Sequence, residues 1–296
     1  MTESRNPLDG KKIIFIGNSY MYFGKMVLMQ KDQFVDFDFE HRRHDPGFFY
    51  QLCRRRGADV DVTNWTIGSH QLNDLMGDRC TRDYKVCFGT RHLDYLPDRR
   101  YDYAVMQVGG CEEEYDWMSW VRRTMDLFRA ENPAVRFLYL VGPAAYGINF
   151  RYGGRPMASV FAHLPELEAL GIRVVDWGRV ITDLAFGKVR PEGSPYTYSK
   201  NSFIIRRRET DGFHENMLAG YITTLMVYCA ITGESPVGLP ADFTDDPALN
   251  PHFDIDAFRE LNYSWGSAED RATNFPEILR DPRELLALQQ LLTRYL

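Results

Sequence analysis

A short apolar run that stops at a glycine, near the start of the chain, most constrains the fold. The run reads Lys11-Lys12-Ile13-Ile14-Phe15-Ile16-Gly17. Consecutive apolar side chains bounded by a residue that breaks regular structure are typical of a strand buried on both faces. Such a strand belongs in the interior of a sheet, with other elements packed over each side.

Four more strand candidates follow, with room for a helix between most of them. They span residues 60–65, 101–108, 136–141 and 172–176. Helical stretches, most with apolar residues at three- and four-residue spacing, span residues 20–30, 115–130, 157–170 and 215–232. Parallel strands need crossover connections, and this alternation provides them. We therefore predict a doubly wound, flavodoxin-like three-layer α/β/α fold with a central parallel sheet of about five strands.

The end of the chain reads as an extension of this domain. Residues 239–252 carry Pro240, Pro247 and Pro251 among acidic residues, which is typical of a surface connection. We expect a main domain over residues 1–240 and a C-terminal helical extension over residues 241–296. The extension is too short to build its own core, so it should pack on the main domain. It either caps a cleft or makes a contact between copies of the chain, as in a homo-oligomer.

Charge and composition exclude several classes of partner. The 41 acidic and 35 basic side chains give a net charge of -6, so no overall positive field attracts nucleic acid or an anionic membrane. The first ten residues are polar and no apolar run reaches about 18 residues, which predicts a cytoplasmic protein. Five scattered cysteines without a C-x-x-C pair indicate reduced thiols, with a Cys80–Cys87 bridge left open for an exported chain.

Ser19 follows the first predicted strand and is a candidate nucleophile. In open parallel sheets, functional groups gather where the carboxyl ends of the strands meet helix N-termini. Backbone N–H groups at such a helix start can stabilise a developing oxyanion. The alternative is that Ser19 only caps the following helix, which is a common role for serine.

A serine nucleophile needs a base, and His214 is the candidate. It closes the group Asp211-Gly212-Phe213-His214, which directly precedes a predicted helix. A turn at the Asp-Gly step would let the carboxylate bind one imidazole nitrogen and leave the other for a serine hydroxyl. The alternative is an Asp-Gly turn followed by a solvent-facing histidine.

Together, Gly17-Asn18-Ser19-Tyr20 and Asp211-x-x-His214 resemble the SGNH, or GDSL-like, hydrolase family. In that family the serine block follows the first strand, and aspartate and histidine share one late block. Two further segments are similar to family blocks, Trp65-Thr66-Ile67-Gly68 and the stretch that ends at Gln107. Residues 220–236 resemble a bacterial subgroup whose first block reads GNSY. The resemblance covers about residues 11–240.

The resemblance implies a serine ester hydrolase that cleaves a small acyl ester, such as an O-acetylated carbohydrate. Its catalytic residues would be Ser19, Asp211 and His214. Backbone N–H groups of Ser19 and Gly68 would bind the oxyanion, together with the side chain of Gln107, because the family's usual Gly-x-Asn is absent here. Residues expected to contact the substrate are Tyr20, Tyr22 and Phe213. The resemblance implies no cofactor and no metal.

Two other functions remain as alternatives. One is a non-catalytic ligand-binding member of the same fold, although the chain keeps all three residues Ser19, Asp211 and His214. The other is a flavodoxin-like phosphate or nucleotide binder that uses the turn at residues 17–19, although no G-x-G-x-x-G or Walker-type loop is present. His41 and His44 stand three apart, but we interpret their segment as a solvated charged patch rather than a metal site.

Overall fold

Five parallel strands form the centre of the molecule. The computed structural model describes residues 6–28, 43–77, 91–96, 98–107, 110, 112–148, 154–204, 214–241 and 281–296. The strands are β1 (Lys12–Gly17), β2 (Asp61–Thr66), β3 (Tyr103–Met106), β4 (Arg136–Leu140) and β5 (Arg173–Val175). They pair in the order β2-β1-β3-β4-β5, and every pair is parallel. This confirms the predicted doubly wound fold and its five strands.

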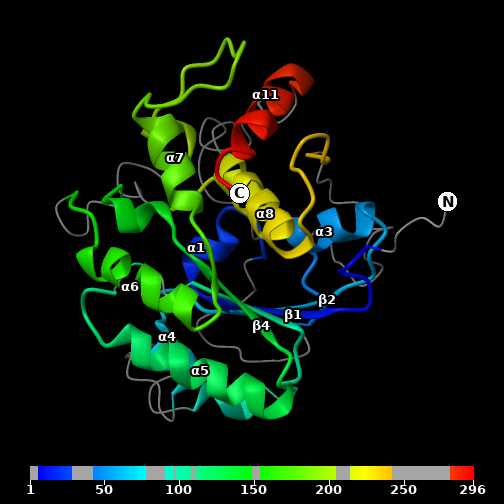
Figure 1. Cartoon of the computed structure of the whole chain (residues 1–296), viewed down its shortest axis with the longest axis vertical. Coiled ribbons are helices and arrows are strands. Elements are labelled where there is room, and N and C mark those ends of the chain that lie inside the picture. The colour runs from blue at the N-terminus through cyan, green and yellow to red at the C-terminus, as the bar shows by residue number, and fades with distance from the viewer. Residues whose placement is uncertain are drawn as a thin grey trace.

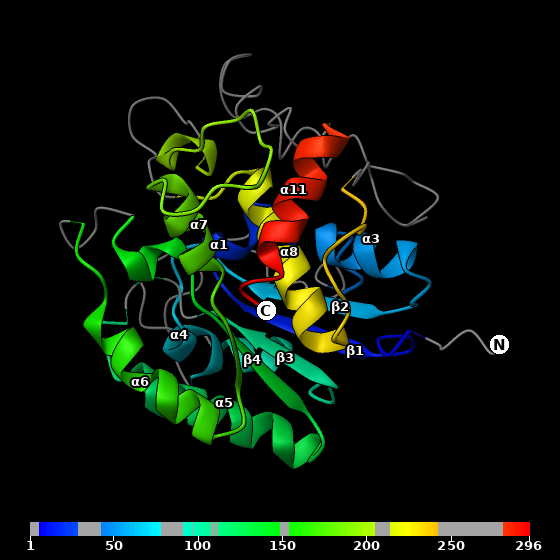
Figure 2. The ribbon, with the colours of Figure 1, turned by 45° about the horizontal axis from the view of Figure 1, so that its top comes forward.

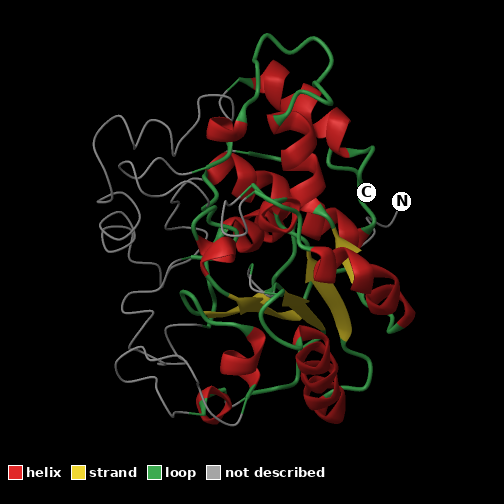
Figure 3. Cartoon of the chain, turned by 90° about the vertical axis from the view of Figure 1, so that its left-hand side faces the viewer, coloured by secondary structure: helices red, strands yellow, loops and turns green. Residues whose placement is uncertain are grey.

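Helices cover both faces of the sheet (Figures 1 and 3). Alternate residues of β1 face opposite layers: Ile13 and Phe15 lie in one hydrophobic core, and Ile14 and Ile16 lie in the other. Over the first core lie α3 (Phe48–Arg55), α7 (Trp177–Ala185), α8 (Met217–Thr232) and α11 (Pro282–Leu292). Over the second lie α4 (Leu72–Met76), α5 (Trp117–Glu131) and α6 (Ala158–Ala169). Shorter helices are α1 (Ser19–Tyr22), η1 (His92–Tyr95), η2 (Pro143–Tyr146) and η3 (Lys200–Ser202).

Helix α8 is the buried centre of the first covering layer. Fourteen of its sixteen residues are buried, so it is apolar all round rather than on one stripe. It contacts α3, α7 and β5, and α11 lies beside it in both views of Figures 1 and 2. No helix in the described parts of the chain has the length and apolar character to cross a membrane.

Helix α1 is much shorter than the sequence predicts. The sequence predicts a helix over residues 20–30, but α1 ends at Tyr22 and Lys25 adopts a left-handed φ of 65°. The physical reason is tertiary: the backbone of Gly24 lies directly against Gly220 in α8, and the chain turns there. Local helix propensity therefore yields to packing against a buried helix.

A buried glutamine holds α11 against α8. The side-chain N–H groups of Gln289 donate to Tyr221 Oη at 2.7 Å and to the Leu239 carbonyl at 2.6 Å. Its Oε1 accepts from the backbone N–H of Gly238 at 2.8 Å. Tyr198 adds a second link by donating to the Glu284 carboxylate. Residues 242–280 lie outside the described residues, so the proposed division at residue 240 stays a prediction.

We expect Gln289→Ala to lower the free energy of unfolding by about 2 kcal/mol, because Tyr221, Leu239 and Gly238 each lose a hydrogen bond, two of them in the buried seam between α8 and α11. Gln290→Ala is the matched control, since the neighbouring glutamine is exposed. Denaturant unfolding of the two variants and the native chain measures the difference. Equal stability of the two variants would contradict the anchoring role of Gln289.

Candidate active site

Three of the predicted site segments meet at the carboxyl edge of the sheet. Strand β1 lies between β2 and β3, so the residues after these strands are neighbours. The ladder continues past the strand ends on both sides: Ile67 N donates to Gly17 O at 3.1 Å, and Gln107 N donates to Ile16 O at 2.9 Å. The structure thus brings Ser19 to an edge that it shares with Gly68 and Gln107.

Ser19 is the first residue of α1, but it does not cap the helix. The cap is Asn18, whose Oδ1 accepts from the backbone N–H of Tyr20 at 3.2 Å. The capping alternative for Ser19 is therefore wrong. Ser19 is partly exposed, whereas Asn18 is buried beneath it. The hydroxyl of Ser19 is therefore not needed to cap the helix.

Asn18 also fixes the loop that carries Gly68. Its Nδ2 donates to the His70 carbonyl at 3.0 Å. His70 Nδ1 lies 2.9 Å from the Gly68 carbonyl, and because a carbonyl only accepts, Nδ1 carries the proton. Among the described residues, none accepts a hydrogen bond from the backbone N–H of Ser19 or Gly68. These two groups are available to bind an oxyanion.

The side-chain amide of Gln107 is buried beside the end of β4. Its Nε2 lies 3.3 Å from the point that a methyl group on Gly142 would occupy. Gln107 Oε1 is buried without a hydrogen-bond partner among the described residues. A buried amide oxygen without a hydrogen-bond partner costs free energy.

His214 packs against the turn that carries Ser19. Its ring centroid lies 4.1 Å from that of Phe23 and 5.7 Å from that of Tyr20. Phe23 stands one helical turn after Ser19, and its backbone N–H donates to the Ser19 carbonyl at 3.2 Å. The histidine is therefore placed beside the first turn of α1, on the side where Ser19 and Phe23 lie.

The segment after His214 is held on two sides. Glu215 forms an antiparallel bridge with Ile204, and Asn216 N donates to the Phe203 carbonyl at 2.9 Å. The Asn216 side chain then caps α8 by accepting from Leu218 N at 3.0 Å. These bonds fix where the chain enters α8, and so they fix the position of the residue immediately before them.

A contact between two glycines sets the spacing between α8 and α1. A methyl group on Gly220 would lie 1.6 Å from the Gly24 carbonyl oxygen, which no packing arrangement allows. A methyl group on Gly24 would lie 2.7 Å from the Gly220 Cα. The two backbones touch, and this brings the histidine segment close to the serine turn.

The other predicted site residues divide into two groups. Asp211 and Phe213 lie outside the described residues. Tyr20 is partly exposed next to His214, as a substrate contact requires. Tyr22 is 2 % exposed in the core, which favours packing, and its role in substrate binding stays a prediction.

The charged patch around His44 lies at the opposite edge of the sheet. His44 Nδ1 is 3.3 Å from the carboxylate of Asp61, the first residue of β2, and His41 lies outside the described residues. Across the parts of the chain that the structure describes, no group of three or more His, Cys, Asp or Glu side chains is arranged to hold a metal.

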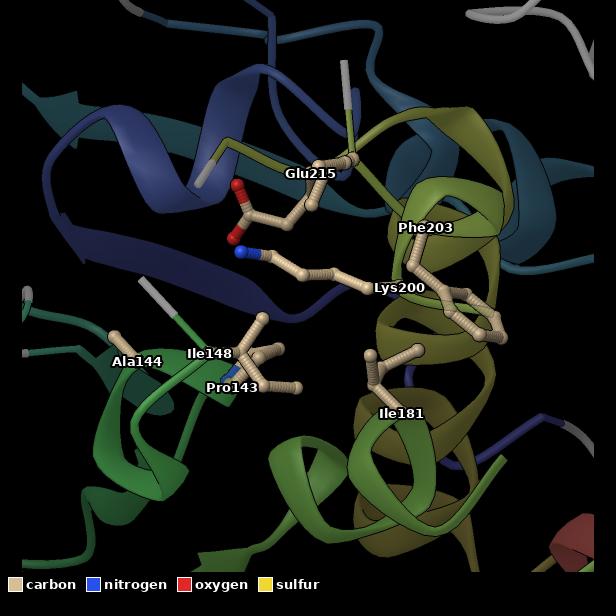
Figure 4. Close-up of a pocket in the computed structure, with 8 residues that line it drawn as sticks. Pro143, Ala144, Ile148, Ile181, Lys200, Phe203 and Glu215 are labelled. Carbon is tan, nitrogen blue, oxygen red and sulfur yellow. The ribbon is translucent and has the colours of Figure 1, made fainter. Parts of the chain in front are cut away.

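A pocket lies next to the histidine segment. It is lined by Pro143, Ala144, Ile148, Ile181, Lys200, Phe203, Ile204 and Glu215. These residues come from η2 and η3, from the residues just after each of them, from α7 and from the bridge before α8. Figure 4 shows the Lys200 side-chain nitrogen pointing toward the Glu215 carboxyl group. Burial lowers the pKa of Lys200 from its ordinary value. The pocket therefore combines apolar walls with one lysine amine and one buried carboxyl group.

Sequence reasoning missed Phe23 as a partner of His214 and missed the Lys200 and Glu215 pair. No local pattern marks these residues, because their partners are distant in the sequence. Gly220 did carry a signal: a glycine inside a run of large apolar helix residues often marks a close approach of another backbone.

We expect Gly220→Ala to destabilise the fold by at least about 2 kcal/mol, because its methyl group has no space. Helix propensity alone predicts the opposite sign, a gain of about 1 kcal/mol. Gly171→Ala is the comparison variant: no atom lies within 4 Å of its added methyl group, so any loss there reports only the strain of its φ of 78°, and the loss in Gly220→Ala should exceed it. Denaturant unfolding decides, and a Gly220→Ala variant as stable as the native chain would rule out the backbone contact.

Comparison with known proteins yields only distant similarity. No protein-family model matches the sequence, and no curated protein matches it. Solved structures with some similarity include a possible lipase from Chitinophaga pinensis, with 12 % identity, a TM-score of 0.42, and coverage of 75 % of this chain and 99 % of the other. A family 3 carbohydrate esterase from Clostridium thermocellum is 11 % identical with a TM-score of 0.43, and the match covers 75 % of this chain and 99 % of the other. A family 2 carbohydrate esterase with a carbohydrate-binding domain from Corynascus thermopiles is 14 % identical with a TM-score of 0.38, and the match covers 77 % of this chain and 67 % of the other. Similarity at this level does not identify an activity for this chain.

Proposed function

We propose that this protein is an SGNH-type serine hydrolase that cleaves a small acyl ester, with Ser19 as nucleophile, His214 as general base and Asp211 as its orienting carboxylate. The observation that carries the proposal is the packing of His214 on Phe23 and Tyr20, beside the turn that begins with Ser19. This packing supports the proposal because His214 lies beside the turn that begins with Ser19, 195 positions away in the sequence. A serine nucleophile requires a base within hydrogen-bond reach, and a histidine near the same turn is the candidate for it.

In the proposed reaction, one imidazole nitrogen of His214 takes the hydroxyl proton as Ser19 Oγ attacks the ester carbonyl. The tetrahedral intermediate collapses when His214 gives this proton to the leaving alcohol, and an acyl-serine remains. Water then attacks the acyl-serine, with His214 again accepting a proton and returning it to Ser19 Oγ. Asp211 would hold the imidazole in the required orientation.

The negative charge that develops on the carbonyl oxygen needs donors that are already in place. The backbone N–H groups of Ser19 and Gly68 are free of partners among the described residues and lie on adjoining loops. Gln107 would supply a third donor through Nε2. One such donor typically contributes about 3 kcal/mol at the transition state, so loss of Gln107 should cost much less activity than loss of Ser19.

We expect the native protein to react with a fluorophosphonate probe and to hydrolyse p-nitrophenyl acetate. Ser19→Ala should abolish labelling, and both Ser19→Ala and His214→Ala should lower kcat/KM by at least about 10³-fold, because nucleophile and base act as a unit. Asp211→Asn should lower kcat by a similar factor. Labelling on gels and initial rates measure these effects.

Ser235→Ala and His44→Ala are the controls, since both side chains are exposed and His44 lies at the opposite edge of the sheet. They should label and turn over like the native chain. An inert native protein, or turnover that survives in Ser19→Ala, would reject the esterase and favour a ligand-binding member of the fold.

Asn18→Ala should lower kcat roughly 10- to 100-fold with little change in KM, because Asn18 ties the Ser19 turn to the Gly68 loop. Asn132→Ala is the matched control. Its Nδ2 also donates to a backbone carbonyl, that of Tyr101, but at the opposite edge of the sheet. Equal losses of kcat in the two variants would show that Asn18 acts only through stability.

A further inference from the structure

The C-terminal helix α11 is bonded to residues 198–203 as well as to α8. Glu284, in the first turn of α11, accepts a hydrogen bond from the Tyr198 hydroxyl. Among the described residues, this hydroxyl is the one donor that reaches the Glu284 carboxylate, whose other oxygen is buried without a partner. Glu284 is 1 % exposed. Burial and the hydrogen bond to Glu284 raise the pKa of Tyr198 from its ordinary value, so the hydroxyl keeps the proton that it donates.

Tyr198 forms one unit with the short helix η3 and with Phe203. The rings of Tyr198 and Phe203 stack with their centroids 5.5 Å apart and an angle of 11° between their planes. The backbone between them forms a closed turn. Ser199 N donates to Ser202 Oγ at 3.1 Å, and Ser202 N donates to the Ser199 carbonyl at 3.0 Å. The stacked rings and the turn hold residues 198–203 in one arrangement.

This unit is bonded directly to the start of α8. Asn216 N donates to the Phe203 carbonyl at 2.9 Å, and Asn216 Nδ2 donates to the Ser202 carbonyl at 2.8 Å. Oδ1 of the same side chain caps α8 by accepting from Leu218 N at 3.0 Å. Asn216 is 1 % exposed, so a shift that breaks these bonds leaves buried polar groups without partners.

The candidate general base is attached to this junction. Glu215, the residue directly after His214, forms the antiparallel bridge with Ile204. The backbone at His214 therefore has two supports. One is α8, which is buried on all sides. The other is the unit of residues 198–203, which is held from α11 by the carboxylate of Glu284.

We propose that Glu284 is a positioning residue for the general base: it holds Tyr198 in place, and the unit of residues 198–203 then holds the segment that carries His214. The inference rests on the proposed function and extends it to a helix outside the stretch that resembles SGNH hydrolases. Glu284 contacts no reacting atom. The C-terminal helix thereby contributes to catalysis without closing over the substrate.

Two substitutions remove the link from opposite sides. Tyr198→Phe deletes the hydroxyl and keeps the ring stack, and Glu284→Met deletes the acceptor. Each should lower kcat for Ser19-dependent hydrolysis of p-nitrophenyl acetate roughly tenfold, with KM within about twofold, because a displaced base loses its alignment with the nucleophile. Glu284→Gln should keep kcat within about threefold of the native value, since its amide oxygen can still accept from Tyr198.

Tyr295→Phe is the matched control. The Tyr295 hydroxyl also joins the C-terminal end of the chain to a carboxylate, that of Asp183 at 3.1 Å, but this carboxylate belongs to α7. The control should keep kcat within about twofold of the native value. Equal losses in Tyr198→Phe and Tyr295→Phe overturn the positioning role. So does an unchanged kcat in Tyr198→Phe, or a loss in Glu284→Gln as large as that in Glu284→Met.

Nuclear magnetic resonance of the histidine rings separates this inference from the proposed function. The His214 ring signal, assigned by its absence in His214→Ala, depends on its distance from the Phe23 ring. It should move in Tyr198→Phe and stay in place in Tyr295→Phe, and an unmoved signal in both overturns the link. Hydrolysis that needs Ser19 but is insensitive to Tyr198→Phe overturns this inference alone. Hydrolysis that is absent or independent of Ser19 overturns the proposed function and the catalytic role of the link, and the ring signal then decides whether the link itself holds His214.

Discussion

The backbone contact between Gly24 and Gly220 determines how the two halves of the candidate site meet. Two chains can approach this closely only where neither residue carries a side chain. The contact stops α1 after one turn and seats α8 directly against the residues that follow Ser19. Everything that α8 carries at its N-terminal end, including the segment with His214, is positioned from this point.

The site thus has two independent supports. Main-chain hydrogen bonds that extend the sheet ladder place Ser19, Gly68 and Gln107, and these bonds depend on strand pairing rather than on side-chain choice. His214 is placed by helix packing and by the bridge between Glu215 and Ile204. Asn18 links the turn that carries Ser19 to the loop that carries Gly68. The ring of Phe23 contacts His214 and so connects the strand-edge residues to the histidine segment. The position of His214 relative to Ser19 therefore depends both on strand pairing in the sheet and on the packing of α8.

The sequence was sufficient for the sheet and for the edge where the site lies. All five predicted strands are present, and four of them are short runs that are mostly apolar, whereas β2 reads Asp-Val-Thr-Asn-Trp-Thr and buries polar side chains. Helix α1 was predicted too long because its end is decided by Gly220, almost two hundred residues away. The pocket was not predicted at all, since Lys200 and Glu215 acquire meaning only when η3 and the segment before α8 come together. Local sequence patterns describe residues that are close in the sequence, so they do not predict contacts between distant segments such as these.

The burial of α8 has a consequence for motion. A helix enclosed on all sides cannot detach by a local fluctuation, because leaving its place exposes apolar surface on every neighbouring element. Amide hydrogens along α8 should then exchange with solvent only through opening of the whole domain. The bridge at Glu215 and the cap at Asn216 join the chain before α8 to the same cooperative unit, so the position of His214 depends on the packing of this helix.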